Sequence, residues 1–299
     1  MKLLLVLNPV SGGTDKTDFL RYAKDRCHFF GIDLSLFRTT GEADCDRLKD
    51  SLQKEKPDRI ASAGGDGTFL LVVQATVDNP IPTGFIPMGS ANGMARELGV
   101  PDDVYEAFDE LMASRMIAEM DLLKVNDKHL CLHMGDVGLN AEMVAGFEAD
   151  DGRGMATYGK YLLRTLTQME EFSYSFQHNG ETISGTAVMI GIGNGSKFGT
   201  GIPMNTVGNP FDGKFEITIV ETINADTILR AGLSLFDETF LKEAETTVYS
   251  MTEAQIKLEQ PQTLQLDGEL IGKVDELNVK VETGKVRLVT TGGNRYLEE

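Results

Sequence analysis

Hydrophobic and polar positions follow two different patterns along the chain, and the change comes near residue 121. Before it, short apolar runs typical of buried strands alternate with stretches whose apolar residues recur at helical spacing. The predicted strands are KLLLVLN, DLSLF, RIASAG and GFIPM, and the predicted helices cover 14–30, 43–54, 67–78, 90–98 and 102–114. This order predicts a parallel sheet with helices on both faces.

After residue 121, short strands with alternating polarity dominate the pattern. The expected strands are HLCLHMGDVGL, TAVMIGIGN, KFEITIVE, TTVYSM, AQIKLE, TLQLDGE, ELNVKV and KVRLVTT, interrupted by helices over 156–170 and 225–236. Many short strands at this spacing predict an antiparallel sandwich. We therefore expect an α/β protein with an N-terminal parallel-sheet α/β domain and a C-terminal antiparallel β-sandwich domain.

Composition narrows the class of protein. The 299 residues are 41% hydrophobic and 25% charged, which is typical of a packed soluble protein, and no apolar run approaches the roughly 18 residues that a transmembrane helix needs. Cys27, Cys45 and Cys131 are widely spaced and odd in number, which favours a reducing, cytoplasmic compartment. Cys131 and His133 alternate onto one strand face, but such a pair is a weak metal signal. A net charge of −18 disfavours nucleic acid as a partner.

Three glycine-containing corners follow strands of the predicted parallel sheet. They are LNPVSGG (7–13), ASAGGDGTFL (61–70) and PMGSANGMAR (87–96). Glycine lets a backbone approach a ligand closely, and the start of a helix favours a phosphate. Each corner alone is explained equally well by a turn or a capped helix. Together they predict a phosphate site, because the carboxyl ends of parallel strands meet at one sheet edge.

These corners, in this order, resemble the diacylglycerol kinase catalytic domain, a family that includes bacterial lipid kinases, sphingosine kinases and ceramide kinases. GGDGT alone is shared with NAD kinases and echoed in phosphofructokinases, whereas the ordered combination is specific. The resemblance covers nearly the whole chain, because further segments are similar to motifs of the family's second half. These segments are GDVGLNAEMV, GKYLLRTLTQM, IGNGSKFGTGIPM, FDGKFEI and QLDGELI.

The resemblance implies an ATP-dependent lipid kinase that transfers the γ-phosphate of ATP to the hydroxyl of diacylglycerol or of a related sphingoid or glycerol lipid. It implies ATP and Mg²⁺ as cofactors, and a cytoplasmic protein that associates peripherally with the inner face of the membrane, where its lipid substrate lies. The implied domains are an ATP-binding domain, 1–122 with 288–299, and a lipid-substrate domain, 123–287. The sequence leaves the oligomeric state open, with a homodimer among the options.

The resemblance also implies roles for matching residues. Glu269 matches the proposed general base, Asp267 stands beside it, and Asp66 is the carboxylate of the phosphate loop, expected to face Mg²⁺ through water. A second Mg²⁺ would be held by Asp212 and by the carbonyls of Lys214 and Phe215. The implied nucleotide contacts are Asn8, Ser11, Gly12, Thr39, Thr40, Gly64, Gly65, Gly67, Thr68, Gly89, Ser90 and Asn92. These residue types suit phosphoryl transfer, which needs a positioned γ-phosphate, neutralised charge and a carboxylate for the attacking hydroxyl.

Two positions depart from the family pattern. Gly93 stands where many bacterial members have an aspartate, which weakens the predicted polar network around Asp66 and the choice of diacylglycerol over a sphingoid base. Phe211 precedes Asp212 where the metal segment typically has two acidic residues, which weakens the second Mg²⁺ site. LDGE and FDG are, in addition, ordinary turn sequences between strands.

Two other interpretations stay open. An NAD kinase-like enzyme shares GGDGT and the two-domain plan, but PMGSANGMAR is more similar to the lipid kinase family. A non-catalytic lipid- or nucleotide-binding protein of the same fold is favoured by Gly93 and opposed by Asp66 and Glu269. Both alternatives have the same two predicted domains and differ from a lipid kinase only in function.

The segment GRGMATYGKYLLR is the candidate for membrane approach. Its cations give local positive charge to an acidic chain, beside a methionine and two tyrosines: Arg153, Lys160, Arg164, Met155, Tyr158 and Tyr161. The alternative is a helix that packs Tyr161, Leu162 and Leu166 into a core, with its cations in water.

Overall fold

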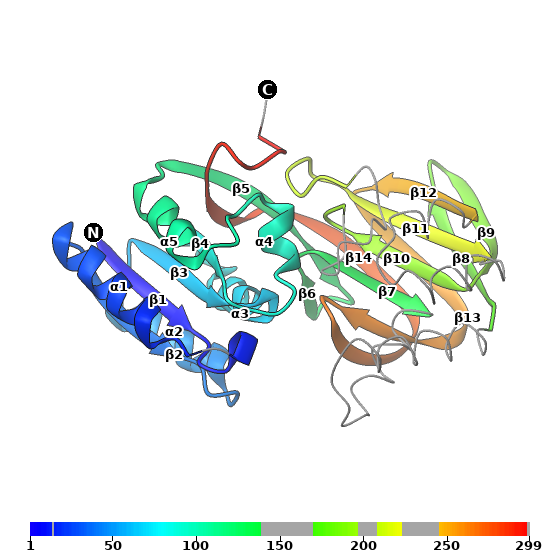
Figure 1. Ribbon diagram of the computed structural model, residues 1–299. Helices are drawn as coiled ribbons and strands as arrows, with labels where there is room; N and C mark the ends of the chain where they lie inside the picture. Colours follow the sequence, from blue (N-terminus) through cyan, green and yellow to red (C-terminus); the bar gives the residue numbers. More distant parts are fainter. Residues whose placement is uncertain (14, 139–169, 197–207, 223–244, 298–299) are drawn as a thin grey trace, which may run out of the picture. The chain divides into compact units, whose positions relative to one another are not determined.

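The computed structural model describes residues 1–13, 15–138, 170–196, 208–222 and 245–297 (Figure 1). The chain divides into two compact units, Met1–Leu122 with Thr283–Glu299, and Leu123–Glu282. The expected helices over 156–170 and 225–236 and the segment GRGMATYGKYLLR lie essentially outside the described residues. No helix within the described ranges is both long and apolar enough to cross a bilayer.

The first unit is built on four parallel strands in the order β2-β1-β3-β4. They are β1 (Lys2–Leu7), β2 (Asp33–Arg38), β3 (Arg59–Gly64) and β4 (Thr83–Pro87). Leu3 to Leu7 of β1 are all buried, as is required of a parallel strand that helices cover on both faces. The end of β14 (Glu269–Thr290) pairs in parallel with β4 through Leu288.

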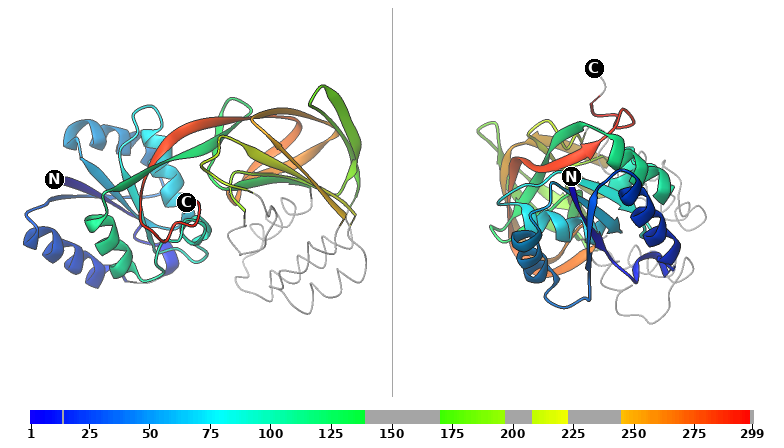
Figure 2. Two further views of the ribbon diagram at one scale, coloured as in Figure 1. Left: turned by 90° about the horizontal axis from the view of Figure 1, so that it is seen from above. Right: turned by 90° about the vertical axis from the view of Figure 1, so that its left-hand side faces the viewer.

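Five α-helices flank this sheet: α1 (Thr17–Phe29), α2 (Asp44–Glu55), α3 (Asp66–Thr76), α4 (Gly93–Glu97) and α5 (Val104–Ala113). Alternate residues of β1 point to opposite faces. Leu3, Leu5 and Leu7 pack with buried residues of α1 and α5, whereas Leu4 and Val6 pack with α2 and α3. Figure 2 shows these helices on the two faces of the sheet. The predicted parallel sheet with two helical layers is confirmed.

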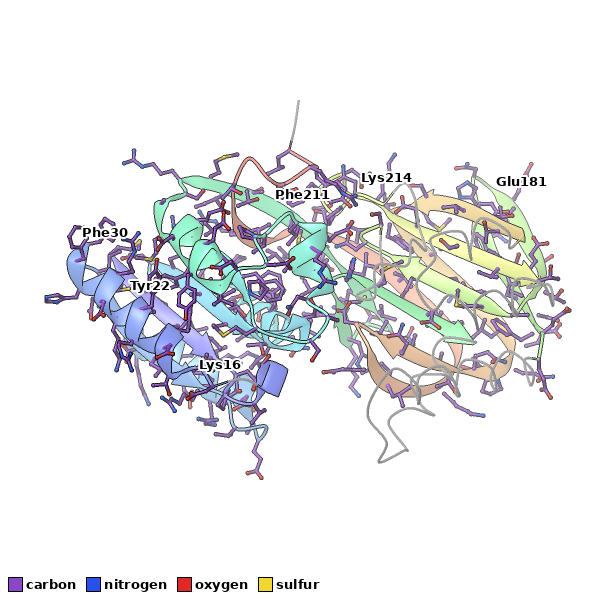
Figure 3. All side chains as sticks on the ribbon, viewed as in Figure 1. Lys16, Tyr22, Phe30, Glu181, Phe211 and Lys214 are labelled. Carbon is purple, nitrogen blue, oxygen red and sulfur yellow. The ribbon has the colours of Figure 1, made fainter. Side chains whose placement is uncertain are left out.

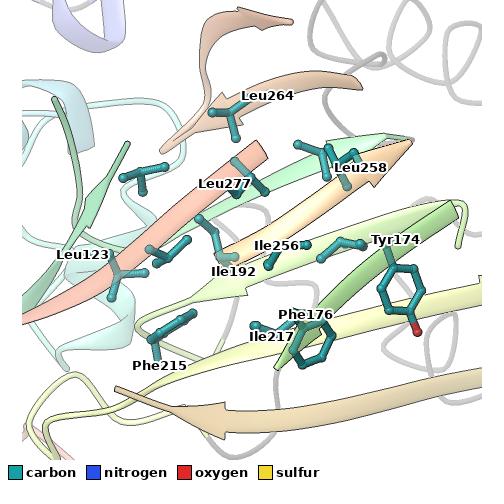
Figure 4. Close-up of a cluster of buried hydrophobic side chains, with 14 of the residues drawn as sticks. Leu123, Tyr174, Phe176, Ile192, Phe215, Ile217, Ile256, Leu258, Leu264 and Leu277 are labelled. Atoms are coloured by element: carbon teal, nitrogen blue, oxygen red, sulfur yellow. The ribbon is translucent and has the colours of Figure 1, made fainter. Parts of the chain in front are cut away.

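The second unit is an antiparallel β structure with its own core. Its ladder runs β12-β11-β10-β7-β13-β14, and β8 pairs with both β13 and β9. The new strands are β7 (Met134–Gly138), β8 (Phe172–His178), β9 (Glu181–Ala187), β10 (Met189–Gly193), β11 (Phe215–Thr222), β12 (Glu245–Met251) and β13 (Glu253–Leu266). Inward-facing residues such as Leu123, Phe215, Ile217, Ile256 and Leu277 form one apolar cluster (Figure 4).

Several predicted strand boundaries are wrong. AQIKLE and the TLQL of TLQLDGE are one strand, β13, whose register shifts between Lys257 and Gln262 around Pro261, whereas Glu269 begins β14. Proline has no N–H to donate, which suits an irregular position. ELNVKV and KVRLVTT are likewise one strand, β14. Gly284 looks like a turn in the sequence, yet it continues the strand with a φ of 62°, and its N–H donates to the Asp121 carboxylate at 2.8 Å.

The sequence interpretation also missed several strands. HLCLHMGDVGL contains two strands, β6 (His129–Cys131) and β7, and the ten-residue β5 (Met116–Val125) was not expected. The hairpin of β8 and β9 was also missed, although Phe172, Tyr174 and Phe176 alternate with polar residues and are buried. The period-two signal was present there, and so was an Asn-Gly turn, Asn179-Gly180, between the two strands, so the sequence interpretation overlooked a hairpin that the sequence does indicate.

Candidate active site

Three loops of the first unit come together at the carboxyl ends of β1, β3 and β4. The first loop bonds to the third, since Ser11 Oγ donates to the carbonyl oxygen of Met88 at 2.9 Å. It also meets β3, where the N–H of Asn8 donates to the Ala63 carbonyl at 3.0 Å. The N–H of Met88 donates to the Gly64 carbonyl at 2.7 Å. The three corners therefore lie at one sheet edge, as their positions after parallel strands predicted.

Glycines allow this close approach of one loop to another. A Cβ on Gly89 would lie 2.5 Å from the Gly65 Cα and 2.7 Å from Asn92 Oδ1. A Cβ on Gly12, whose φ is +60°, would overlap the carbonyl oxygen of Met88. Gly67 differs, because a Cβ there would meet no heavy atom within 4 Å. Packing between loops thus explains Gly12 and Gly89, whereas Gly67 has open space in which a ligand could lie.

We expect Gly89→Ala to damage the fold and Gly67→Ala to leave it intact. Overpacking at Gly89 should lower the free energy of unfolding by about 1–3 kcal/mol, whereas alanine inside the first turn of α3 should be neutral or slightly stabilising. Denaturant unfolding of both variants measures this. Weaker nucleotide binding by Gly67→Ala at unchanged stability would indicate contact with a ligand. Equal unfolding free energies for the two variants would contradict the loop-packing interpretation.

Asp66 connects the second loop to the third. It is the first residue of α3, it is half-buried, and its two carboxylate oxygens each accept one backbone N–H. Gly93 N donates to Oδ2 at 2.9 Å, and Met94 N donates to Oδ1 at 2.9 Å. Any residue except proline offers such an N–H. Gly93 therefore supplies its backbone N–H to Asp66 although it lacks the carboxylate that many bacterial members have there. The polar network around Asp66, which this departure from the family pattern had put in doubt, keeps this hydrogen bond.

Other predicted nucleotide contacts shape their own loops. Asn92, with a φ of 51°, accepts the Gly89 N–H at 2.8 Å and donates Nδ2 to the Gly89 carbonyl at 3.0 Å. Asn8 Oδ1 accepts the Val10 N–H at 3.1 Å. The N–H of Thr39 donates to the Leu7 carbonyl at 3.0 Å, which keeps the loop after β2 beside β1. Ser90 is exposed, and the Thr68 side chain is buried behind Gly64.

Thr40 belongs to a turn that depends on Asp44, a residue that sequence reasoning missed. Asp44 accepts N–H bonds from Thr40 at 3.0 Å and from Gly41 at 2.8 Å, and it pairs with Arg47 Nη1 at 2.5 Å. Burial raises the pKa of the Asp44 carboxyl, but these hydrogen bonds outweigh that effect, so that its pKa is lowered overall. The available signal was an aspartate four residues after Thr40, at the start of the predicted helix over 43–54.

Lys16 is a second residue that sequence reasoning missed. It lies at the start of α1, is 7% exposed, and its Nζ donates to the Ser11 carbonyl at 2.7 Å (Figure 3). Burial lowers the pKa of the Lys16 ammonium. A single lysine after SGG gives no clear sequence signal, since most lysines are solvated. The structure places it beneath the first loop.

Hydrogen bonds fix the Asp-Gly turn of the second unit. It joins β13 to β14 with φ values of 50° at Asp267 and 86° at Gly268, as two-residue hairpin loops require. The Gly268 N–H donates to Gln265 Oε1 at 2.8 Å, and Gln265 Nε2 donates to the buried Asp136 carboxylate. Glu269 is the exposed carboxylate directly after this turn.

The Asp267 carboxylate faces the segment between β6 and β7. It accepts the N–H groups of Leu132, His133 and Met134 at 2.7, 2.9 and 3.1 Å, and the thiol of Cys131 at 3.5 Å. Burial raises the pKa of the Asp267 carboxyl, and the three N–H donors oppose that rise. These contacts give Asp267 a structural function and use the Cys131 thiol for a hydrogen bond.

The predicted metal segment forms a tight turn before β11. Asp212 is exposed, and its Oδ1 accepts the Lys214 N–H at 2.9 Å. Phe215 is buried at the start of β11. Phe211 and Lys214, on either side of Asp212 in the sequence, are labelled in Figure 3. A carboxylate suits Mg²⁺ in donor type, but Mg²⁺ takes six oxygen ligands. Within the described ranges, no group of three or more His, Cys, Asp or Glu residues could hold a metal ion. The predicted set thus contributes one carboxylate, that of Asp212, and the carbonyls of Lys214 and Phe215.

Comparison with known proteins places this geometry in a family. Residues 2–125 match the diacylglycerol kinase catalytic domain, and residues 137–290 match the YegS C-terminal NAD kinase beta sandwich-like domain. A YegS-like protein of Yersinia enterocolitica, named as a probable lipid kinase, is 28% identical over 90% of this chain and 91% of its own. A Staphylococcus carnosus protein, provisionally named a lipid kinase, is 27% identical over 82% of this chain and 81% of its own.

Solved structures agree on the fold. A Bacillus anthracis diacylglycerol kinase structure superposes with a TM-score of 0.70 at 21% identity and covers 98% of both chains. Another Bacillus anthracis structure, of a protein assigned to the diacylglycerol kinases, gives a TM-score of 0.77 at 24% identity over 98% of this chain and 97% of its own. Together, the two matched domains show that the chain belongs to the YegS-like and diacylglycerol kinase-like lipid kinase family.

Proposed function

We propose that the protein transfers the γ-phosphate of ATP to a hydroxyl group of a lipid, with diacylglycerol and sphingoid or glycerol lipids as the acceptor class. The observation that carries this proposal is the convergence of three loops around Asp66. Its carboxylate joins the phosphate loop to the first turn of α4, next to the loop that Lys16 supports. Membership of the lipid kinase family supports the lipid acceptor.

The residues of the first unit would bind and orient ATP. Gly67 leaves open space at the start of α3, where helix N–H groups and the helix dipole favour a phosphate. Lys16 would add positive charge next to the first loop. Mg²⁺ bound with ATP would neutralise phosphate charge, and the Asp66 carboxylate would hold one of its waters. This arrangement lowers the cost of bringing a nucleophile to an anionic phosphate.

The second unit would supply the group that accepts a proton. Glu269 is exposed at the end of a turn whose backbone is fixed by Gln265 and Asp267. Fixing the backbone limits the positions that a carboxylate can reach, which is what a general base requires. We therefore assign the base to Glu269 and a supporting function to Asp267. Asp212 is our candidate for a second Mg²⁺ site.

Phosphate transfer can be tested directly with the purified protein. It should be incubated with γ-labelled ATP, Mg²⁺ and vesicles that contain, in turn, diacylglycerol, monoacylglycerol, sphingosine, ceramide or phosphatidylglycerol, with NAD as a water-soluble acceptor. We expect label in at least one lipid. Label in NAD alone would replace the lipid kinase by an NAD kinase-like enzyme. No label in any acceptor would overturn the proposal in favour of a binding protein.

We expect Lys16→Met to weaken ATP binding. The substitution removes a positive charge next to the first loop, together with the hydrogen bond that holds the Ser11 carbonyl, so we expect affinity for ATP to fall by roughly tenfold. Titration with a fluorescent ATP analogue measures the change. Lys24→Met, on the exposed side of α1, is the matched control and should bind as the unmodified protein does. Unchanged affinity in Lys16→Met would remove Lys16 from the nucleotide site.

A further inference from the structure

Residues 291–297, here named the C-terminal tail, fold into a compact turn after β14. Asn294 is 1% exposed and organises it: its Nδ2 donates to Thr290 Oγ1 at 3.2 Å, and its Oδ1 accepts the Tyr296 N–H at 3.1 Å. The Leu297 N–H donates to the Asn294 carbonyl at 3.1 Å. The C-terminal tail is therefore an ordered part of the first unit.

Two side chains of the C-terminal tail bind the last residue of α4. Arg295 Nη2 donates to Glu97 Oε1 at 2.8 Å, and the Tyr296 hydroxyl donates to the same oxygen. The Glu97 side chain is only 1% exposed. The Arg295 guanidinium also lies over the Tyr296 ring, 4.7 Å from its centroid. A carboxylate this buried depends on such partners, because removing it from water without them is costly.

The backbone of the C-terminal tail also packs against the residues that follow α4. A Cβ on Gly293 would lie 3.0 Å from the Gly99 carbonyl oxygen, and a Cβ on Gly99 would overlap the Gly293 carbonyl. Gly99 has a φ of +67°, which glycine adopts without strain. Side chains and backbone thus fix the C-terminal end of α4 to the C-terminal tail.

The opposite end of α4 holds Asp66. The helix spans only five residues, Gly93–Glu97, and so short a helix is not stable by itself. Its position must come from its contacts. At its first turn the N–H groups of Gly93 and Met94 bond to Asp66, and at its last residue Glu97 bonds to the C-terminal tail. The two ends are about 6 Å apart at the helical rise of 1.5 Å per residue.

We propose that Glu97, Arg295 and Tyr296 are positioning residues, which hold α4 so that its first-turn N–H groups fix the Asp66 carboxylate in the phosphate loop. The C-terminal tail would then be part of the nucleotide site although it contacts no substrate. The catalytic consequence rests on the proposed function, since it requires that Asp66 acts in phosphoryl transfer. The structural consequence is that the N–H groups of residues 93 and 94 are ordered, and this consequence does not depend on the proposed function.

The full-length variants Arg295→Ala and Tyr296→Phe test this proposal. Arg295→Ala should speed amide hydrogen exchange at Gly93 and Met94 by about tenfold or more, because opening of α4 becomes easier. It should lower kcat by about tenfold or more, because a small displacement of Asp66 near the reacting groups slows the transfer. The KM for lipid should change little. Arg295→Lys keeps the positive charge and should recover part of kcat. Tyr296→Phe should show a smaller effect in the same direction.

Arg26→Ala is the matched control. Arg26 binds Asp109 through two hydrogen bonds of 2.9 Å, and so joins α1 to α5 in the same unit, away from α4. Its loss should lower thermal stability without changing exchange at 93 and 94 or kcat. In an Asp66→Asn background, Arg295→Ala should cause little additional loss of turnover, because both substitutions affect the same element.

The outcomes separate the two proposals. Unchanged exchange at Gly93 and Met94 in Arg295→Ala would overturn the positioning of α4, whatever the activity. Faster exchange with unaltered kcat would overturn its catalytic consequence. If the unmodified protein phosphorylates no acceptor, the proposed function fails, and the exchange measurement still decides whether the C-terminal tail positions α4.

Discussion

Asp66→Asn is expected to lower lipid kinase turnover by about 100-fold or more. The substitution removes the negative charge that would hold a Mg²⁺-bound water. It also replaces one of the two carboxylate oxygens by an NH₂ group, which cannot accept a hydrogen bond, so that the N–H of Gly93 or of Met94 loses its acceptor. The loss of that hydrogen bond should lower the free energy of unfolding by about 1–3 kcal/mol. Steady-state kinetics with labelled ATP and thermal unfolding measure the two effects.

Asp103→Asn is the control for Asp66→Asn. Asp103 accepts two backbone N–H groups, those of Tyr105 and Glu106, at the start of α5. Asparagine caps helices about as well as aspartate, so this variant should keep its turnover and nearly all of its stability. If Asp66→Asn retained near-normal turnover on its true lipid, Asp66 would be a structural carboxylate and no more.

Glu269→Gln is expected to lower turnover by about 100-fold or more with the fold intact. Glutamine has the same size but cannot accept the proton of the attacking hydroxyl. Because Glu269 is exposed and follows a turn fixed by other residues, its replacement should leave the unfolding transition unchanged. Single-turnover measurements with labelled ATP would show whether the chemical step is slowed.

Glu259→Gln provides the comparison, since Glu259 is also an exposed carboxylate on β13 of the same unit. It should behave as the unmodified protein does. Glu269→Asp keeps a carboxylate on a shorter side chain and should recover part of the activity that Glu269→Gln loses. Full activity of Glu269→Gln would assign the base to another group and leave the Asp-Gly turn with a structural function only.

The parallel sheet was predictable because its signal is local. Each strand of the first unit is a continuous apolar run, and each helix has apolar residues at regular spacing. The second unit was harder, since its strand lengths are decided by partners far along the chain. β14 runs through Gly284 because β13, Asp121 and β4 provide bonds on either side of it.

The candidate site was predictable as a set of motifs, while the function of each residue was not. Asn92 matched a nucleotide contact, yet its side chain bonds to Gly89 of its own loop. Asp267 matched a position beside the base, yet its carboxylate bonds to three backbone N–H groups between β6 and β7. A motif records which residue type is present and not which atom it contacts.

The sequence by itself determined the two-part fold class, the three glycine corners and the family, because these depend on periodicity and on residues close together in the chain. Only the tertiary structure decided that backbone N–H groups at 93 and 94 bind Asp66, that Lys16 supports the first loop, and that Arg295 and Tyr296 bind Glu97. These contacts join residues up to 199 positions apart. Such contacts leave no periodic signal, because folding brings the partners together.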